Sequence, residues 1–399
     1  MKQDWKPDEL RATSAEIRGA VMPKSITPEM VGGTLAGLTE AVAEVVETLG
    51  EIPREHVTVK VRGYDGQGGV SGAGATVWLD VFHTKGYPCV SFPRQELTAD
   101  AEGIVEFDVP RGFKYAVFSQ IAGLGASFQI TGSAANTRRK IELWNMPIGV
   151  MAFGYSDIGL DTDEASIYRE VPFVTNSVSD DSSDYQQDAE WDIDTDRGEY
   201  SDGYDLIGVL VSTADTSFAI TPNSISEETM TWCKARDYGT LVANIIPIND
   251  KDTGETWEEC QNRARADFDG NMNTAKILDF CHEPTAALFC GASCYLYTEQ
   301  RFLPSAGQLA IMQLNNKQIN AVMTALNNAR GEDTAYKLLP YQNDKGQWQN
   351  PNGHWEYWWS STIYDEYCSW VVYYDGDILN GIRNNTTDVR AVSAFHFEY

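Results

Sequence analysis

The segment between Asp365 and Asp388 has the residue types of a surface that binds other molecules without covalent chemistry. It mixes Tyr, Asp, Asn, Thr and Ile, and it follows neither the period of an amphipathic helix nor that of a half-buried strand. Tyr supplies a large contact area at low entropy cost, while Asn, Ser, Thr and Gly supply adaptable hydrogen bonds. This composition predicts a recognition surface with Tyr367 and Tyr373 as aromatic anchors. The alternative is that one or both rings cover the protein's own core.

Short motifs surround this segment in a fixed order: Phe302-Leu303-Pro304-Ser305, Gly307-Gln308-Leu309, Trp359-Ser360-Ser361-Thr362, Trp370, Asp375-Gly376 and Val389-Arg390 to Phe395. The order resembles the C-type-lectin-fold proteins that are targets of diversity-generating retroelements. These are relatives of phage receptor-binding tail proteins and of variable gut-bacterial surface proteins. The resemblance covers residues 206–395. It implies that an adenine-directed reverse transcriptase rewrites Asn-type codons in the C-terminal repeat.

The genetic code allows a check of this resemblance. An Asn codon randomised at its two adenines can encode most residues, but never Trp, Lys, Glu, Gln or Met. Between Asp365 and Asp388, only Glu366 and Trp370 fall outside the permitted set. Average composition predicts several more exclusions in a segment of this length, so the observation favours the resemblance.

The resemblance also sorts residues by role. The fixed framework of the family matches Trp359, Ser360, Ser361, Thr362, Trp370, Asp375, Gly376, Val389, Arg390, Ala394 and Phe395. The variable positions, which are the candidate ligand contacts, match Asp365, Tyr367, Cys368, Val371, Tyr373, Asp377, Leu379, Asn380, Gly381, Ile382, Asn384, Thr386 and Thr387. Trp355 and Tyr357, directly upstream, join the candidate contacts, with a core role as their alternative.

Catalytic and metal-binding chemistry find little support. Cys368 has no His-Asp arrangement to activate it, so we expect a small, semi-buried apolar residue. The fold that the resemblance implies is shared with formylglycine-generating enzymes, but the pair of reactive cysteines that they need is not visible near the C-terminal strands. Asp192–Asp196 and Asp267–Asn273 have some of the oxygen-ligand spacing of calcium loops, but the first lacks the closing Glu and the second matches a structural stretch of the family. We therefore predict no enzyme activity, no metal and no cofactor.

The charge of the chain restricts its partners. Its 399 residues carry a formal net charge of −28, which argues against nucleic acid or an anionic membrane as a partner. Much of the acidity lies in an insertion at 180–205, which we expect to be a solvated loop. The seven Cys are odd in number and irregularly spaced, which favours free thiols. The first residues lack the apolar run of a signal peptide, so we expect synthesis and folding in a host cytoplasm.

The N-terminal residues 1–55 predict a helix for attachment and oligomerisation. Thr27-Pro28-Glu29 has the features of a helix start, and Gly50 those of a stop. Apolar residues between them alternate at spacings of four and three, as in a coiled-coil seam: Val31, Leu35, Leu38, Val42, Val45 and Leu49. The seam is compatible with a homotrimer. The alternative is one amphipathic helix packed on its own chain.

The remaining chain predicts two further domains, making an α+β multi-domain protein. Residues 56–144 alternate with period two and resemble the carboxypeptidase-regulatory and transthyretin-like β-sandwiches, which implies a rigid spacer. Residues 145–399 predict the C-type-lectin-fold domain, with the acidic insertion at 180–205 and a variable region at about 355–388. Trp257 to Phe280 and Gln308 to Asn327 read as its two flanking helices.

These patterns together predict a phage tail protein for host adsorption, located in the virion. Its partners would be a bacterial cell-surface receptor, either a glycan or an outer-membrane protein, and other virion tail proteins. The absence of an export signal favours this over a bacterial surface adhesin with the same tip. A structural tail protein that binds only other virion components is a further alternative.

Overall fold

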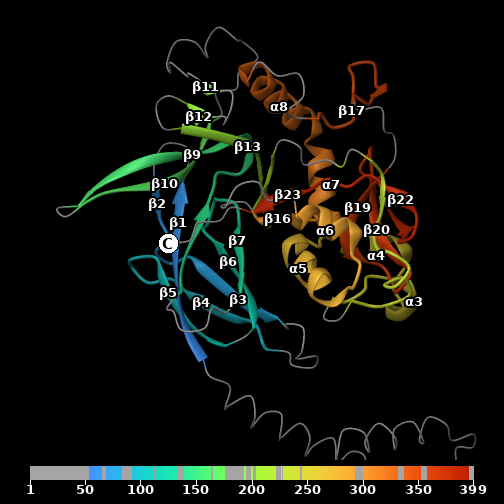
Figure 1. Ribbon diagram of the computed structural model, residues 1–399, viewed down its shortest axis with the longest axis horizontal. Coiled ribbons are helices and arrows are strands. Elements are labelled where there is room, and N and C mark those ends of the chain that lie inside the picture. The colour runs from blue at the N-terminus through green and yellow to red at the C-terminus, as the bar shows by residue number, and fades with distance from the viewer. Residues whose placement is uncertain are drawn as a thin grey trace, which may run out of the picture. The chain divides into compact units, whose positions relative to one another are not determined.

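The structure is a computed structural model of the chain, shown in Figure 1. It describes the residues 54–64, 69–82, 92–111, 113–132, 139–162, 165–175, 193–194, 199–200, 204–221, 226, 228–242, 245–292, 300–330, 337–351 and 357–394. The chain divides between Glu55 and His56. The predicted N-terminal helix, Trp355 and most of the acidic insertion lie outside the described residues.

Strands dominate the described part of the chain, which confirms the β-rich character predicted from the period-two patterns. The helices are α3 (Asp250–Thr253), α4 (Trp257–Arg265), α5 (Gly270–Phe280), α6 (Thr285–Ala292), α7 (Ala306–Leu314) and α8 (Asn316–Arg330). The strands of the first sheets are β1 (Arg54–Tyr64), β2 (Gly69–Ser71), β3 (Thr76–Phe82), β4 (Gln95–Thr98), β5 (Ile104–Pro110), β6 (Lys114–Gln120), β7 (Ser127–Gly132) and β8 (Arg139–Asn145). The later strands are β9 (Gly149–Thr162), β10 (Ala165–Thr175), β11 (Ile193–Asp194), β12 (Glu199–Tyr200), β13 (Tyr204–Ser212), β14 (Ser217–Ile220), β15 (Met230–Thr231), β16 (Gln300–Phe302), β17 (Tyr341–Gln342), β18 (Trp348–Gln349), β19 (Tyr357–Ile363), β20 (Cys368–Tyr373), β21 (Ile378–Ile382), β22 (Thr386–Thr387) and β23 (Val392–Ala394).

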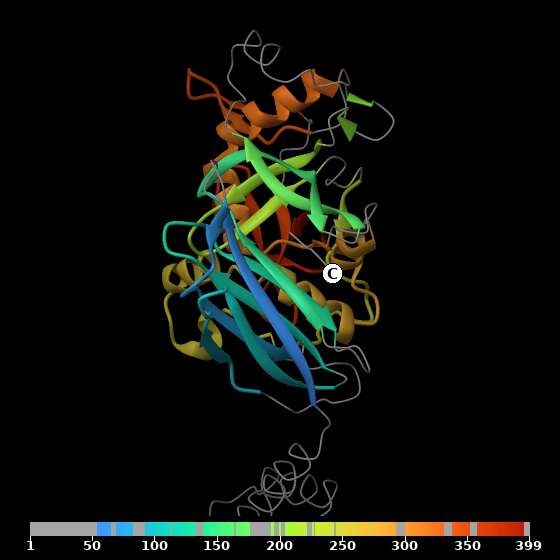
Figure 2. The ribbon, with the colours of Figure 1, turned by 90° about the vertical axis from the view of Figure 1, so that its left-hand side faces the viewer.

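Two four-stranded sheets account for the strands up to β8. In one, β1 pairs with β2 and β5 and also, in parallel, with β8; the blue β1 is visible in Figure 2. The other has the antiparallel order β4-β3-β6-β7. Along β1 the residues alternate between buried and partly exposed, and Val57, Val59 and Val61 face inward. This is the alternation that a strand with one buried face requires.

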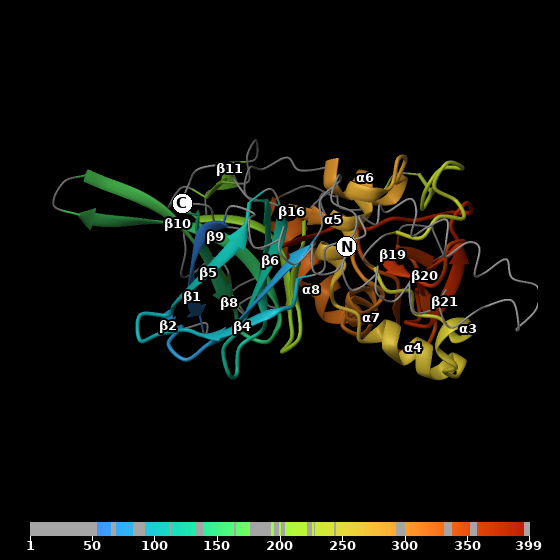
Figure 3. The same cartoon turned by 90° about the horizontal axis from the view of Figure 1, so that it is seen from below.

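Later strands form an eight-stranded sheet and a smaller three-stranded sheet. The larger sheet has the order β10-β9-β13-β14-β23-β16, with β11 and β12 off this path. The smaller sheet has the order β19-β20-β21. Helices α7 and α4 lie against it, α7 on β19 and β20 and α4 on β21, as Figure 3 shows. The segment predicted to bind ligands therefore begins on a small, helix-supported sheet.

One hydrophobic core joins the two groups of sheets. Phe128 of β7 packs with its ring centroid 5.9 Å from that of Phe302 of β16. Both rings belong to a single buried cluster that also contains Phe218, Leu309 and Trp370. Strand β7 therefore shares its core with the sheets that carry the C-terminal segment.

The two helices predicted at 257–280 and 308–327 are each divided in the structure. The first breaks before Gly270, because the Asp267 carboxylate accepts the Asp269 backbone N–H at 2.9 Å in a tight turn. The second breaks at Asn315, whose amide donates to the Ile311 carbonyl at 2.8 Å and so ends α7. Side-chain hydrogen bonds of this kind compete with the backbone hydrogen bonds of a continuous helix. The spacing of the apolar residues gives no sign of this competition, so it did not predict the breaks.

Gly307 permits the close packing of α7 on the turn that follows α4. A Cβ at this position would lie 2.4 Å from the Asp267 carbonyl oxygen and 2.5 Å from that of Arg265. Ser305 caps α7 and its hydroxyl also donates to the Asp267 carbonyl at 2.6 Å. Ser305 and Gly307, which belong to the motifs that follow Phe302, are thus explained by helix capping and by close contact between two backbones.

Asp269, at the start of α5, lies in a cluster of charges that includes side chains from β3 and the segment before β4. Burial, and next the neighbouring Asp267, raise the pKa of Asp269 to about 6, although Lys276 and Arg94 oppose the shift. Arg94 itself donates to both carboxylate oxygens of Asp80, at 2.8 and 2.5 Å. The charged form of Asp269 is therefore disfavoured in the folded protein.

We expect Asp269→Asn to make stability less dependent on pH. The folded pKa of about 6 lies above the ordinary Asp value of 3.8, so the folded state binds more protons than the unfolded state between these values. Wild-type stability then falls as the pH rises through this window. The advantage of the variant should grow from pH 4 to pH 6 by on the order of 2 kcal/mol and stay level above it.

Urea unfolding of both proteins at several pH values measures this difference. A difference in unfolding free energy that stays constant between pH 4 and pH 6 would contradict the raised pKa.

Candidate ligand-binding surface

Three buried tryptophans hold the β19–β21 sheet against the segments around it. The indole N–H of Trp359 donates to the Met230 carbonyl, that of Trp370 to the Ile248 carbonyl, and that of Trp232 to the Ser360 carbonyl, each at 2.9 Å. All three rings are fully buried. Each indole therefore combines a large buried apolar area with a satisfied polar group, and together they hold two distant chain segments, at 230–232 and at Ile248, against one sheet.

The motif Trp359 to Thr362 lies where the pairing of β19 with β20 becomes irregular. The Ser360 hydroxyl donates to the Trp370 carbonyl at 2.6 Å. The Thr362 hydroxyl donates to the Asp267 carboxylate at 2.6 Å and accepts the Ala306 backbone N–H at 2.9 Å. Small hydroxyl side chains thus satisfy the polar groups that the irregular strand leaves inside the protein.

Arg383, directly after β21, is a fully buried cation. Its guanidinium donates to the carbonyl of Asp365 at 2.6 Å, to that of Thr240 at 3.0 Å and to the Ser369 hydroxyl at 3.0 Å. A longer bond of 3.4 Å reaches the Glu366 carbonyl, and the group stacks 4.5 Å from the centroid of Trp232. Burial lowers the pKa of Arg383 from its ordinary value. The planar fork of Arg suits several acceptors at once.

Arg383 joins the C-terminal segment to a loop at 237–241 that comes more than a hundred residues earlier. The Gly239 backbone N–H donates to the Glu366 carbonyl at 3.0 Å, beside the bond from Arg383 to Thr240. The rings of Tyr238 and Tyr367 meet edge to face with centroids 5.3 Å apart. The loop and the turn at 365–368 therefore form one continuous surface.

Gly239 is required at this junction for two reasons. Its φ of +82° lies in the left-handed region, and a Cβ would lie 3.1 Å from Cε1 of Tyr367. A side chain would be strained by the backbone and would also press on the tyrosine ring.

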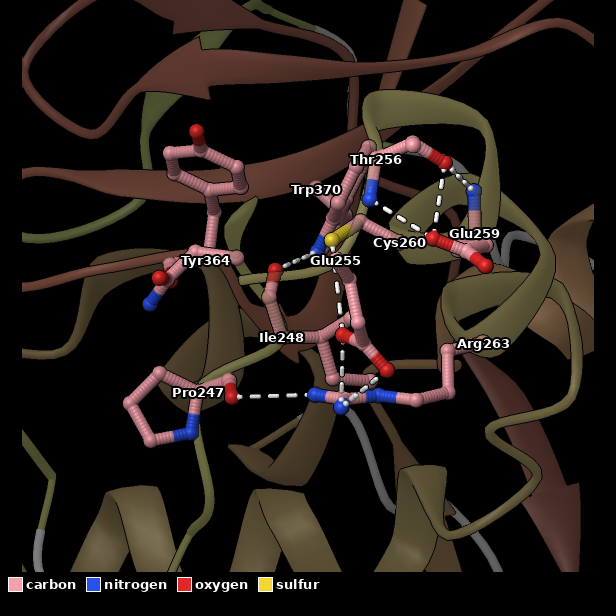
Figure 4. Close-up of polar contacts among 10 residues, drawn as sticks. Pro247, Ile248, Glu255, Thr256, Glu259, Cys260, Arg263, Tyr364 and Trp370 are labelled. Atoms are coloured by element: carbon pink, nitrogen blue, oxygen red, sulfur yellow. Dashed lines mark hydrogen bonds and ion pairs between the residues drawn. The ribbon is translucent and has the colours of Figure 1, made fainter. Parts of the chain in front are cut away.

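The segment that contains Pro247 and Ile248 is bonded to Arg263 of α4, as Figure 4 shows. Arg263 donates from one nitrogen to both carboxylate oxygens of Glu255, at 2.9 and 2.8 Å, and from another to the Pro247 carbonyl at 3.4 Å. Thr256 and Glu259 form a reciprocal capping box at the start of the helix. Pro247 directly precedes Ile248, whose carbonyl accepts the Trp370 indole N–H, so the Arg263 bond helps to fix the segment that receives this indole.

Asp365, a predicted ligand contact, is instead a structural residue. It is only 5% exposed, and its carboxylate accepts the backbone N–H groups of Tyr367 at 2.8 Å and Cys368 at 2.7 Å. Lys251 completes the shell with an ion pair of 2.8 Å. Burial raises the pKa of Asp365, but the Lys251 bond and the two backbone bonds outweigh it, so the net shift is downward. Asp365 fixes the turn that presents Tyr367.

Two further predicted contacts lie in the interior. Val371 is 1% exposed and packs in a cluster with Trp359 and Trp232. Thr387 is fully buried, and its hydroxyl donates to the Tyr357 carbonyl. Four consecutive residues of β20, from Ser369 to Val372, are buried, so both faces of this strand are covered, and β22 pairs with β15. The side chains of Val371 and Thr387 therefore do not reach the surface. The ligand-contact prediction for Asp365, Val371 and Thr387 is therefore corrected to a structural role.

Four predicted contacts are partly buried. Tyr357 and Tyr373 are cross-strand neighbours whose rings lie 5.0 Å apart, and both pack on the cluster that contains Trp359. Burial raises the pKa of Cys368 to about 11, so its thiol is a poor nucleophile. A Cβ on Gly381 would lie 2.8 Å from Val371 and 3.0 Å from Trp359, so glycine lets β21 pass over these side chains.

The other predicted contacts are exposed. We call these residues, together with the exposed Asn385, which was not among the predicted contacts, the display surface: Tyr367, Asp377, Leu379, Asn380, Ile382, Asn384, Asn385 and Thr386. Strand β21 is an end strand of its sheet, and its residues alternate between the two faces, so the display surface wraps around the edge of the sheet.

The described residues contain no candidate metal site. No group of three or more His, Cys, Asp or Glu side chains there could hold a metal ion. Both carboxylate oxygens of Asp267, in the second predicted calcium-like stretch, are occupied by donors from Thr362, Asn273 and Asp269. Among the described helices, none is long and apolar enough to cross a membrane.

Comparisons with known proteins give no family for this chain. No family model matches it, and no curated protein matches it. One similar solved structure is a candidate carbohydrate binding protein from Pseudomonas aeruginosa, with 17% identity over 23% of this chain and 89% of that chain and a TM-score of 0.19. Another is chlorocatechol 1,2-dioxygenase from Pseudomonas putida, with 12% identity over 36% of this chain and 99% of that chain and a TM-score of 0.16. Neither similarity is strong enough to inform the function.

Sequence reasoning missed the residues that connect the display surface to the rest of the protein. Arg383 lies within the predicted variable region but was assigned neither role, and the loop at 237–241 was not considered. A signal for Arg383 did exist, since it is the only Lys or Arg between Asp365 and Asp388. From Ile378 to Thr387 its neighbours are apolar or neutral, and a lone cation in such a stretch is a candidate for burial if it finds several hydrogen-bond partners.

We expect Arg383→Lys to destabilise the protein by about 3 kcal/mol, because one ammonium cannot reach both Thr240 and the acceptors between Asp365 and Ser369, and hydrogen bonds to charged groups are worth about 1.5–3 kcal/mol each. Thermal and urea unfolding measure the loss. Arg236→Lys, at an exposed position of the neighbouring loop, is the matched control and should change little. Similar stability of the two variants would show that the guanidinium does not hold these segments together.

Proposed function

We propose that this protein is a phage tail receptor-binding protein. In this proposal, an α+β multi-domain chain carries a C-type-lectin-fold tip on a β-sandwich spacer, and the display surface binds a receptor on a bacterial cell. Adenine-directed retroelement mutagenesis would diversify that surface. The expected location is the virion, after synthesis in the host cytoplasm.

The observation that carries the proposal is the separation of buried and exposed residues within one short segment. Trp359, Trp370, Val389 and Arg390, which the resemblance assigns to a fixed framework, are all buried. Most residues that it assigns to variable positions are exposed or half-buried. Exposed positions tolerate substitution at small cost in stability, usually within about 0.5 kcal/mol, whereas core positions do not. A segment with this arrangement supports a changeable surface on a fixed scaffold.

The chemistry of the display surface also suits recognition. Tyr367 is 46% exposed, Ile382 44% and Leu379 37%, and exposed Asn and Thr side chains lie between and after them. Aromatic and apolar residues provide buried area on binding, and amides and hydroxyls provide hydrogen bonds that adapt to different partners. Weak individual contacts would be sufficient, because a homotrimer raises avidity by about 10² to 10⁴. The N-terminal residues 1–55 would then attach the trimer to other virion tail proteins.

The two anchor tyrosines are expected to respond differently to substitution. Tyr367→Ala should weaken binding to a receptor-bearing cell by about tenfold, the scale of one aromatic hot spot, and leave the melting temperature nearly unchanged. Tyr373→Ala should lower the melting temperature, because its half-buried ring packs on the buried cluster that contains Trp359 as well as on Tyr357, whereas Tyr367 is 46% exposed.

Flow cytometry of the fluorescently labelled protein on a panel of bacterial strains measures binding, and calorimetry measures stability. Failure of the wild type to bind any strain would count against the proposed function. Equal binding by wild type and Tyr367→Ala would place the contact surface elsewhere.

A further inference from the structure

The loop at 237–241 has features that the display surface alone does not explain. Tyr238 is half-buried and meets the exposed ring of Tyr367, while Leu241 is 51% exposed. Burying Tyr and Leu side chains against a partner is favourable by roughly 25 cal/mol for each Å² of apolar surface removed from water. The loop therefore adds apolar contact area beside the predicted anchor.

The loop is also fixed in position relative to the display surface. Arg383 and the Gly239 N–H tie it to the turn at 365–368 through bonds of 3.0 Å each. The Asp237 carboxylate anchors its other side by accepting the backbone N–H groups of His282 at 2.9 Å and Glu283 at 2.5 Å. A loop held at both sides loses little further conformational freedom when a partner binds.

The charges of this region indicate the chemistry of the partner. From Ile378 to Thr386 the only charged side chain is Arg383, which is fully buried, whereas the chain as a whole has a formal net charge of −28. Lys234 and Arg236 are exposed at the start of the loop, and Glu366 is partly exposed in the facing turn. Asp377 is also exposed, so the charges beside the exposed Leu241, Leu379 and Ile382 are of both signs and give no single-sign field. The exposed aliphatic side chains fit a partner with apolar side chains, and the net charge of −28 disfavours a phosphate-rich one.

We infer that Tyr238 and Leu241 form a constant part of the receptor site beside Tyr367, and that the partner is a polypeptide surface on the cell with exposed apolar side chains. This inference rests on the proposed function. Branched aliphatic side chains such as Leu241, Leu379 and Ile382 have no flat face for a sugar ring, but they pack well against protein side chains. Residues outside the variable region would then supply affinity that every diversified version keeps.

Three variants test the site on a strain that binds the wild-type protein. Tyr238→Ala and Leu241→Asp should each reduce cell binding about tenfold or more, with melting temperatures close to that of the wild type. Leu97→Asp is the matched control, because Leu97 is similarly exposed, at 42%, but lies on β4. Wild-type binding by Leu241→Asp would overturn the inference, even if Tyr238→Ala proved unstable.

Treatment of the same cells tests the class of partner. Protease treatment of the cell surface should abolish binding, and periodate oxidation of its glycans should leave binding unchanged. Binding that survives protease but is lost after periodate would overturn the inference while leaving the proposed receptor-binding function intact. Binding to no strain at all would instead overturn both.

Discussion

The buried guanidinium of Arg383 is the interaction on which the arrangement of the C-terminal half depends most. A cation without exposed surface is costly unless its donors are satisfied, and here the acceptors come from two parts of the chain that are far apart in the sequence, Thr240 and the stretch from Asp365 to Ser369. The need to satisfy this charge brings the turn at 365–368, strand β20 and the loop at 237–241 to one point. The exposed residues around that point gain a fixed geometry as a result.

The three tryptophans also join distant segments to the β19–β21 sheet through buried groups whose hydrogen bonds are satisfied. Trp232, Trp359 and Trp370 each bury a large ring and donate one hydrogen bond to a carbonyl from another segment. Trp232 also lies under the Arg383 guanidinium, so the two kinds of interaction meet. Because these contacts use buried groups, exposed positions on β21 and after it are free to differ without loss of the framework. Gly381 is an exception, since the ring of Trp359 leaves no room for a side chain there.

Much of the local structure could be predicted from the sequence, because buried positions carry apolar residues and the spacing of these residues follows the period of a strand or helix. The alternation of Val57, Val59 and Val61 predicted a strand with one buried face. Trp359 and Trp370 were correctly predicted to be buried framework residues. Breaks in helices were not visible, because the capping bonds of Asp267 and Asn315 depend on where distant groups lie. Asp365 was misassigned for the same reason: a polar residue in a variable-looking segment gives no sign that Lys251 and two backbone N–H groups will surround it. Contacts between distant segments, such as Tyr238 with Tyr367, are set by tertiary structure alone.

In the proposed function, a fixed, buried framework presents a surface that adenine-directed mutagenesis changes. The most direct measurement is to sequence the DNA flanking this gene in several isolates. The account predicts a near-copy of the segment encoding residues 355–395 beside a reverse transcriptase gene, with differences confined to adenines of the copy and falling in codons of the display surface. Absence of such a copy, or differences spread over all bases and over framework codons such as those of Trp359 and Trp370, would contradict it.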